Sequence, residues 1–397
     1  MKILFIAPQP FFTERGTPIA VKLAVEALSR FGHEVDLLTY HEGLDVDIPR
    51  VRHYRISAPP GVRSVPIGFS PKKLVCDAWL AAAALKRVRS TRYDVVHAVE
   101  EAVFIALMLR PFTKARIIYD ADSIMSDQIA QRWPKARAIS AIARAAEGWA
   151  FKRSDMVLAV CAAIARHAQT HTPHANVRVL PDVAFAPVGS VNPVEDLRQY
   201  IPAGRPLALY VGNLESYQGF DLLVEAQALI APEQRCGIVA IGGTEASIAS
   251  YRAKAAAAGI ERDIVFLGPR PLDNLHQYLQ QADILCSPRR DGVNTPMKVY
   301  SYMASGKAIL ATDIESHSQV LDVETALLVT PTAGAMAKGL ETLRTHAVLR
   351  SLLGQAAARR ANTEFSLAAF ETRLKDAYRL LTPRPQEPRI GRTLPTT

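Results

Sequence analysis

The chain has 397 residues, of which 49% are apolar and 21% charged, an ordinary globular composition that excludes a disordered chain. Its 47 Lys and Arg residues outnumber 38 Asp and Glu residues, so the net charge is +9. This length predicts about two or three domains. No apolar run is long enough for a transmembrane helix, and the first residues do not resemble a signal peptide. Four scattered cysteines without a CxxC pair argue against a zinc site or a disulfide framework, so we expect a cytoplasmic protein.

The first half opens with the pattern of a parallel α/β sheet. Residues 2–7 form an apolar run, a loop follows, and an amphipathic helical pattern continues to Gly32, after which residues 34–39 form a second strand. Thr17 is predicted as the N-cap of this helix and Pro18 as its first residue, where a missing N–H costs nothing. A strand–helix–strand opening indicates parallel pairing.

The second half opens in the same way at residues 206–214. Strand-like runs then recur at residues 237–241, 263–267, 283–287, 308–312 and 326–329, with helical stretches between them. Residues 186–205 are rich in Pro, Gly and Val and predict a linker. We therefore predict two doubly wound domains, residues 1–185 and residues 206–365, followed by an amphipathic helix from residue 366 and a frayed Pro-rich tail.

Residues 283–306 carry the clearest chemical signal. They predict a strand at 283–287, a loop, and a helix at 296–305 with Thr295 as N-cap, so free helix amides would point into the crevice beyond the strand. Arg289, Arg290 and Lys298 add positive charge, and Asn294 adds a donor, which together favour a phosphate site without a metal. The alternative is that both arginines are surface loop residues and Thr295 only caps the helix.

Neither half carries the glycine fingerprint of a dinucleotide site, a P-loop or a GxSxG motif. The expected ligand site is therefore the cleft between the two domains. At this point the chain resembles the GT-B glycosyltransferases of family 4, also called group 1. The resemblance rests on the order and spacing of motifs at residues 14–17, 32–35, 209–213, 218–226, 266–268, 299–307, 311–312 and 326–329.

This resemblance implies an α/β fold of two Rossmann-like domains facing a deep cleft, with the C-terminal helix crossing back so that residues 366–397 pack on the first domain. It implies a retaining hexosyltransferase that takes a UDP- or GDP-sugar on its second domain and a glycan or lipid-linked glycan on its first. No cofactor and no metal are implied. Preorganised donors and cations would stabilise the departing diphosphate.

The resemblance also assigns roles to residues of this chain. Arg289 and Lys298 would hold the diphosphate, and Asp120 would lie near the reacting hydroxyls. Further donor-binding residues would be Gly16, Gly212, Asn213, Asn294, Thr295 and Ser301. The acceptor side would include Arg15, His97 and Asp122.

Three motif sites depart from the pattern of this family. Asn213 and Gln218 stand where members usually carry Arg and Lys, and Val293 and Ser301 stand where they carry paired glutamates. Asp120 lies near the place of a frequent histidine. We expect Arg289 and Lys298 to have taken over the phosphates, although an unusual donor or a loss of transfer activity would also fit. A non-catalytic GT-B partner subunit and a sugar-nucleotide epimerase are the rival functions.

Two other patterns have competing interpretations. Asp120 and Asp122 form a DxD pattern, which metal-dependent glycosyltransferases of another fold use, but the two-domain architecture disfavours a metal site. Asp120 would instead contact acceptor or sugar hydroxyls, or cap a local turn. His97 with Glu100 and Glu101 would suit proton transfer, or His97 would be structural.

The positive charge predicts a partner or merely a solvated basic face. No zinc finger, RNP-like motif or basic-aromatic stripe is present, so nucleic acid is not expected. The apolar-basic stretch 75–88 would let the protein lie on the inner face of the cell membrane as a peripheral protein, and an anionic membrane surface is therefore a predicted partner. An ordinary core-facing helix with a basic rim is the alternative.

Overall fold

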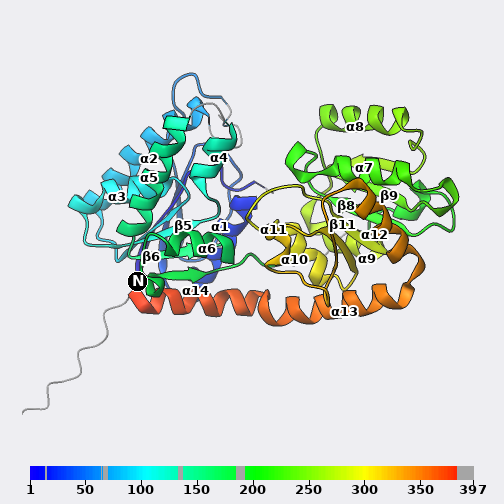
Figure 1. Ribbon diagram of the computed structural model, residues 1–397. Helices are drawn as coiled ribbons and strands as arrows, with labels where there is room; N and C mark the ends of the chain where they lie inside the picture. Colours follow the sequence, from blue (N-terminus) through cyan, green and yellow to red (C-terminus); the bar gives the residue numbers. More distant parts are fainter. Residues whose placement is uncertain (14–15, 64, 66–69, 133–136, 185–192, 382–397) are drawn as a thin grey trace, which may run out of the picture.

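Two α/β domains lie side by side in the computed structural model, which describes residues 1–13, 16–63, 65, 70–132, 137–184 and 193–381 (Figure 1). The first sheet has seven strands in the order β3-β2-β1-β4-β5-β6-β7, and all its pairings are parallel. Its strands are β1 (Lys2–Ala7), β2 (Glu34–Thr39), β3 (Val51–Arg55), β4 (Val95–Val99), β5 (Arg116–Ala121), β6 (Met156–Ala159) and β7 (Val177–Val179).

The second sheet has six parallel strands in the order β10-β9-β8-β11-β12-β13. They are β8 (Leu207–Val211), β9 (Gly237–Ile241), β10 (Ile264–Gly268), β11 (Ile284–Ser287), β12 (Ala308–Thr312) and β13 (Leu327–Val329). Parallel strands need crossover connections, and the alternating helices predicted from the sequence supply them. The predicted α/β class with two doubly wound sheets is confirmed.

Helices cover both faces of the first sheet, so its strands are buried on both sides. One face packs on α2 (Pro71–Ser90), α3 (Ala102–Met108), α5 (Arg137–Arg153) and α6 (Ala162–Gln169), and α4 (Met125–Arg132) lies against α5. The other face packs on α1 (Gly16–Arg30) and on the distant α14 (Leu367–Leu381). A short 3₁₀ turn, η1 (Arg110–Phe112), follows α3.

The second sheet is covered in the same manner. One face packs mainly on α7 (Phe220–Leu229), α8 (Glu245–Ala257) and α12 (Ala333–Thr345), and the other on α9 (Leu275–Gln281), α10 (Met297–Ala304) and α13 (Ala347–Glu364). The short α11 (Glu315–Ser318) follows β12. Further 3₁₀ turns include η2 (His174–Asn176) and η4 (Ser216–Gln218).

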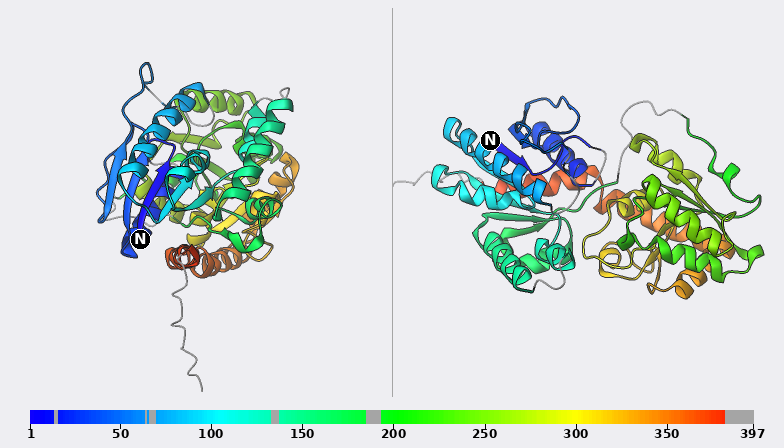
Figure 2. Two further views of the ribbon diagram at one scale, coloured as in Figure 1. Left: turned by 90° about the vertical axis from the view of Figure 1, so that its left-hand side faces the viewer. Right: turned by 90° about the horizontal axis from the view of Figure 1, so that it is seen from above.

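The C-terminal helices join the two domains. In Figure 1, α13 runs along the second domain and α14 continues beneath the first. Phe370, Leu374 and Tyr378 of α14 are buried in the core of the first domain together with Phe5 and Val25. The predicted crossing of the last helix back to the first domain is thus confirmed. Figure 2 shows the same arrangement from two other sides.

Both predicted threonine caps are wrong in detail. Helix α1 begins at Gly16, so Thr17 and Pro18 lie inside its first turn, where the backbone N–H lacks an intrahelical partner and proline is tolerated. Helix α10 begins at Met297 after Pro296 and ends at Ala304, and no side chain caps it. Thr295 does not cap α10 because its hydroxyl accepts a hydrogen bond from Gln319 Nε2 at 3.0 Å instead.

No helix in the described part of the chain has the length and apolar character needed to cross a membrane.

Candidate functional site

The loop after β11 is built around Arg289. Its Nε donates to the Asp291 carbonyl at 2.7 Å, Nη1 to the Asn294 carbonyl at 2.9 Å, and Nη2 to Asn294 Oδ1 at 3.2 Å. Gly292 has a φ of +121°, and a Cβ there would collide with the guanidinium, so the backbone wraps closely around Arg289. Three of the five guanidinium donors are therefore used inside the loop, and two remain for a ligand.

Lys298 lies on the first turn of α10, close to the end of β8. Its Nζ is 3.2 Å from Gln218 Oε1 and 4.0 Å from the centre of the Tyr210 ring. Burial and the nearby charge of Arg289 lower the pKa of Lys298 to about 7 from an ordinary value of 10.5. Among the described residues, no carboxylate forms an ion pair with either cation. The site is short of negative charge, and a bound anion would supply it.

Glycines let the backbone approach these cations closely. Gly212, at the end of β8, has a φ of +147°, and a Cβ there would lie 3.4 Å from Lys298 Nζ. Gly242, after β9, has a φ of +111°, and its Cβ would collide with the Gly212 carbonyl. Any side chain at Gly242 would therefore push the turns after β8 and β9 apart, and the turn after β8 lies beside Lys298.

The structure brings most of the predicted donor residues into this region. Asn213 is exposed, and its side chain lies 3.4 Å from the Tyr217 hydroxyl, while the Tyr217 ring faces the Arg289 guanidinium at 5.4 Å. Thr295 and Ser301 are both buried, and Ser301 lies one turn after Lys298 on α10. The contacts of Asn294, Thr295 and Ser301 with a nucleotide sugar remain predictions.

Two predicted residues near the start of α1 have different outcomes. Arg15 lies outside the described residues. Gly16 is exposed as the first residue of α1, and a Cβ there would meet no atom within 4 Å. Its approach to the phosphates on domain closure stays a prediction.

His317 is buried and structural. Its Nδ1 lies 2.8 Å from the Thr312 carbonyl and its Nε2 2.8 Å from Ser287 Oγ, so the ring ties β12 to β11. Burial lowers the pKa of His317 to about 4, which keeps the ring neutral near pH 7. The Thr312 hydroxyl in turn donates to the Arg289 carbonyl. This network holds the start of the Arg289 loop, where it leaves β11, against β12.

In the first domain, Asp120 lies near the carboxyl end of β5 and is linked to α14 through His97. His97 Nε2 is 3.1 Å from Asp120 Oδ2, and His97 Nδ1 is 2.7 Å from the Tyr378 hydroxyl. With Nε2–H donating to the Asp120 carboxylate, Nδ1 is left to accept from the Tyr378 hydroxyl. His97 is fully buried and stacks on Phe5 at 4.1 Å, so it orients Asp120 and has no open face for a substrate.

Other carboxyl groups gather around Asp120 at the same sheet edge. Burial and the neighbouring Asp120 raise the pKa of Asp182 to about 7, and burial raises the pKa values of Glu100 and Asp122 above their ordinary range. Ser123 donates to Glu100 at 2.8 Å. Within the DxD pattern, Asp120 pairs with His97, and Asp122 is buried close enough to Asp120 for that neighbouring charge to raise its pKa as well. Among the described residues, no three His, Cys, Asp or Glu side chains form a group suited to a metal ion.

The carboxyl edges of the two sheets are connected by direct contacts. Gln319 Oε1 accepts from the Ala163 amide at 3.1 Å, and Gln319 Nε2 donates to the Val293 carbonyl at 2.8 Å. Arg166 pairs with Glu315 at 2.5 Å. The start of α6 in the first domain thus contacts α11 and the Arg289 loop in the second.

Sequence reasoning did not find Tyr378, Asp182 or Gln319. Asp182 follows a short strand at the same edge as Asp120, and that position is the one signal that could have pointed to it. Tyr378 lies 281 positions from His97, and Gln319 lies 156 positions from Ala163, so no local pattern connects either pair.

Comparison with known proteins agrees with this architecture. The family model described as Glycosyltransferase Family 4 matches residues 16–182, and the model described as Glycosyl transferases group 1 matches residues 205–346. The chain belongs to the family 4, or group 1, glycosyltransferases. The two matches follow one another along the chain in the order of its two sheets.

Curated relatives of this glycosyltransferase chain match over part of its length. A D-inositol 3-phosphate glycosyltransferase of Corynebacterium aurimucosum is 32% identical over 186 residues, which cover 45% of this chain and 44% of that protein. A lipopolysaccharide 1,2-N-acetylglucosaminetransferase of Salmonella typhimurium is 30% identical over 148 residues, which cover 35% of this chain and 39% of that protein. The chain thus spans less than half the length of these relatives.

Solved structures share the fold across nearly the whole chain. Sucrose-phosphate synthase from Thermosynechococcus elongatus superposes with a TM-score of 0.79 at 20% identity and covers 96% of this chain and 98% of that one. HepE from Anabaena, solved with UDP-glucose, superposes with a TM-score of 0.70 at 15% identity and covers 96% and 100%. These likenesses show the GT-B fold.

Proposed function

We propose that this glycosyltransferase moves a sugar from a UDP- or GDP-sugar to a hydroxyl of a glycan or lipid-linked glycan, with retention of configuration and without a metal. The observation that carries the proposal is the uncompensated pair Arg289 and Lys298 beside the glycine turn at Gly212. The Anabaena relative in complex with UDP-glucose and the Salmonella relative named for lipopolysaccharide support the donor and acceptor classes.

The cations would act on the leaving group. Breaking the bond between the sugar and the diphosphate concentrates negative charge on the departing oxygen. Lys298 and the two free donors of Arg289 would oppose that charge, and they need little rearrangement because the loop and α10 already hold them. Asp120, oriented by His97, would accept a hydrogen bond from the reacting hydroxyl.

Nucleotide binding tests the donor site. Titration of UDP and GDP by calorimetry should show binding of one of them to the unaltered protein. Lys298→Ala should weaken this binding about tenfold or more, since a charge-assisted hydrogen bond is lost. Lys338→Ala, an exposed lysine on α12, is the matched control and should bind as the unaltered protein does. Equal affinity in Lys298→Ala would remove Lys298 from the site.

A binding subunit without transfer activity is the second candidate. It is favoured by the neutral Asn213 and Gln218 and by the use of three Arg289 donors inside its own loop. Slow hydrolysis of a nucleotide sugar by the purified protein, unaffected by a chelator, would support the enzyme. Binding with neither hydrolysis nor transfer would support the subunit, and epimerised donor would identify an epimerase.

A further inference from the structure

Helix α5 has large apolar side chains on its solvent side. Ile139, Ile142 and Trp149 are 51%, 70% and 46% exposed. Ile142 and Trp149 are seven residues apart, so they lie on the same side of the helix, with Ile139 one turn before Ile142. The single acidic residue of α5, Glu147, is buried and accepts from the Met125 amide and the Ser126 hydroxyl. The solvent side of α5 thus combines apolar surface with no carboxylate.

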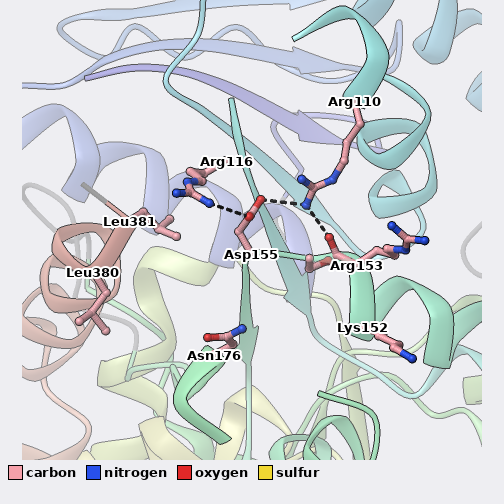
Figure 3. Close-up of a pocket in the computed structure, with 9 residues that line it drawn as sticks. Arg110, Arg116, Lys152, Arg153, Asp155, Asn176, Leu380 and Leu381 are labelled. Atoms are coloured by element: carbon pink, nitrogen blue, oxygen red, sulfur yellow. Dashed lines mark hydrogen bonds and ion pairs between the residues drawn. The ribbon is translucent and has the colours of Figure 1, made fainter. Parts of the chain in front are cut away.

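A basic cavity of about 520 Å³ opens at the last turn of this helix (Figure 3). Asp155 in its wall is paired with Arg110 at 2.9 Å and with Arg116 at 3.1 Å. Lys152 and Arg153 also line it, and neither side chain forms an ion pair with a residue that the structure describes. Positive charge therefore exceeds negative charge in the cavity wall.

Apolar surface also borders this cavity. Leu380 and Leu381 of α14 line it opposite α5, and Leu380 is largely exposed. Phe112 follows Arg110 by two residues in η1 and is also exposed. Arg153 lies one turn after Trp149, so the cavity and the apolar side of α5 form one continuous surface.

We propose that this surface docks the protein on an anionic lipid bilayer. We call it the α5 face and define it by Ile139, Ile142, Trp149, Lys152 and Arg153, together with the cavity beside them. The indole and the two isoleucines enter the interfacial region, and the cavity cations pair with lipid phosphates. Aromatic and aliphatic side chains next to unpaired cations, without exposed acid on the helix, complement an anionic bilayer.

The position of the α5 face suits an acceptor held in the membrane. Arg116 lines the cavity at the amino end of β5, and Asp120 lies four residues further along the same strand, about 13 Å away. The cavity end of the α5 face lies at the opposite edge of the sheet from the Arg289 loop. Because α5 connects two parallel strands, it runs antiparallel to them, and Ile139 and Ile142 near its start lie toward the carboxyl edge. The docking itself is independent of the proposed transfer reaction.

The stretch that the sequence indicated for a membrane contact has one face in the protein core, and its membrane contact stays a prediction. Residues 75–88 belong to α2, whose Cys76, Leu80, Ala84 and Val88 are buried in the core of the first domain. One side of this stretch therefore faces the core, and Val75 and Trp79 near its start are exposed.

Vesicle flotation tests the proposal without donor or acceptor. The purified full chain should bind vesicles that contain phosphatidylcholine and phosphatidylglycerol. It should dissociate from them as the salt concentration rises, and it should bind vesicles of pure phosphatidylcholine only weakly. Lys152→Gln/Arg153→Gln should bind the anionic vesicles about thirtyfold more weakly, since each basic residue contributes about fivefold. Ile142→Gln/Trp149→Gln should also lose binding, because less apolar surface enters the bilayer.

Val348→Gln/Leu352→Gln on α13 is the matched control, because these side chains are 73% and 60% exposed, against 70% for Ile142 and 46% for Trp149. Circular dichroism should show all variants folded, since every altered residue lies on the surface. No binding of the unaltered protein to anionic vesicles would overturn the proposal. Unchanged binding of both α5 variants, or an equal loss in the α13 control, would overturn it as well. Nucleotide affinity should be the same in all variants, so failure of the vesicle assay would leave the proposed transfer function intact.

Discussion

Burial of Lys298 has two opposite effects. The buried ammonium group destabilises the free protein, but it also provides a positive charge ready to bind an anion. Its pKa of about 7 lies below the ordinary value of 10.5, so between these values the folded protein binds fewer protons than the unfolded chain. The free energy of unfolding therefore rises with pH across this window. Lys298→Met removes the buried charge and should raise the unfolding midpoint at pH 7, with a difference that disappears as the pH approaches 10.5.

UDP or GDP should stabilise the unaltered protein but not Lys298→Met. The buried charge that destabilises the free protein would then be the charge that binds the nucleotide. Thermal unfolding with and without nucleotide, at several pH values, measures both effects. A Lys298→Met variant that is less stable than the parent at pH 7 would show that the ammonium is already compensated.

Asp182 has the opposite sign of pH dependence. Its pKa of about 7 lies above the ordinary 3.8, so the folded protein binds more protons than the unfolded chain between these values, and stability falls as the pH rises through them. Asp182→Asn should therefore be more stable than the parent by about 2–4 kcal/mol above pH 7, and equally stable near pH 4. Urea unfolding at both pH values checks this, with exposed Asp376→Asn as the control. A stability difference independent of pH would contradict it.

At the scale of elements, α14 does more than cover the first sheet. Tyr378 fixes His97, and His97 fixes Asp120, so the last helix reaches the predicted acceptor side of the cleft through two hydrogen bonds. The aromatic stack of His97 on Phe5 holds the plane of the imidazole ring. A helix that follows α13 of the second domain thus positions a side chain of the first.

Tyr378→Phe tests this link. It leaves a buried imidazole nitrogen without its donor and should destabilise the protein by about 1–3 kcal/mol. It should also lower the rate of sugar transfer, or of donor hydrolysis, while nucleotide affinity stays unchanged, because Asp120 loses its orientation and the donor site does not. Phe370→Leu on the same helix removes packing but no hydrogen bond, so it should lose stability and keep the rate. Equal rates in Tyr378→Phe and the parent would reduce Tyr378 to a packing residue.

At the scale of the whole molecule, the fold was predictable because its signals are local. Apolar runs, helix-ending glycines such as Gly32 and Gly306, and the regular alternation of elements repeat every few tens of residues. The partner of a polar side chain is not local. The sequence indicated Thr295 as a helix cap. Its hydroxyl instead accepts a hydrogen bond from Gln319, which lies 24 residues further along the chain. In the same way, Arg289 was visible as a cation near a strand end, but its enclosure by its own loop was not.

Gln319 is one of the side chains through which the two domains touch near the predicted site, together with the Arg166–Glu315 ion pair. It accepts from the Ala163 amide at the start of α6 and donates to Val293 and Thr295 in the Arg289 loop, so one amide group links both sheet edges. Such links between domains are small compared with the domain cores, and domains joined in this way move relative to one another by default. Gln319→Ala removes the link, leaves the Ala163 N–H without its acceptor, and should let the domains separate.

The expected result is a larger radius of gyration in small-angle X-ray scattering and a lower transfer rate, because the acceptor side meets the donor side less often. Nucleotide affinity should fall by less than about threefold, since Lys298 and the Arg289 donors remain on one domain. Ser318→Ala, which removes only a local bond to the Ile314 carbonyl, is the matched control and should leave both measurements unchanged. An unchanged radius of gyration and an unchanged rate in Gln319→Ala would show that this contact does not hold the two domains together. The orientation of the domains would then depend on the passage of α13 into α14 beneath them.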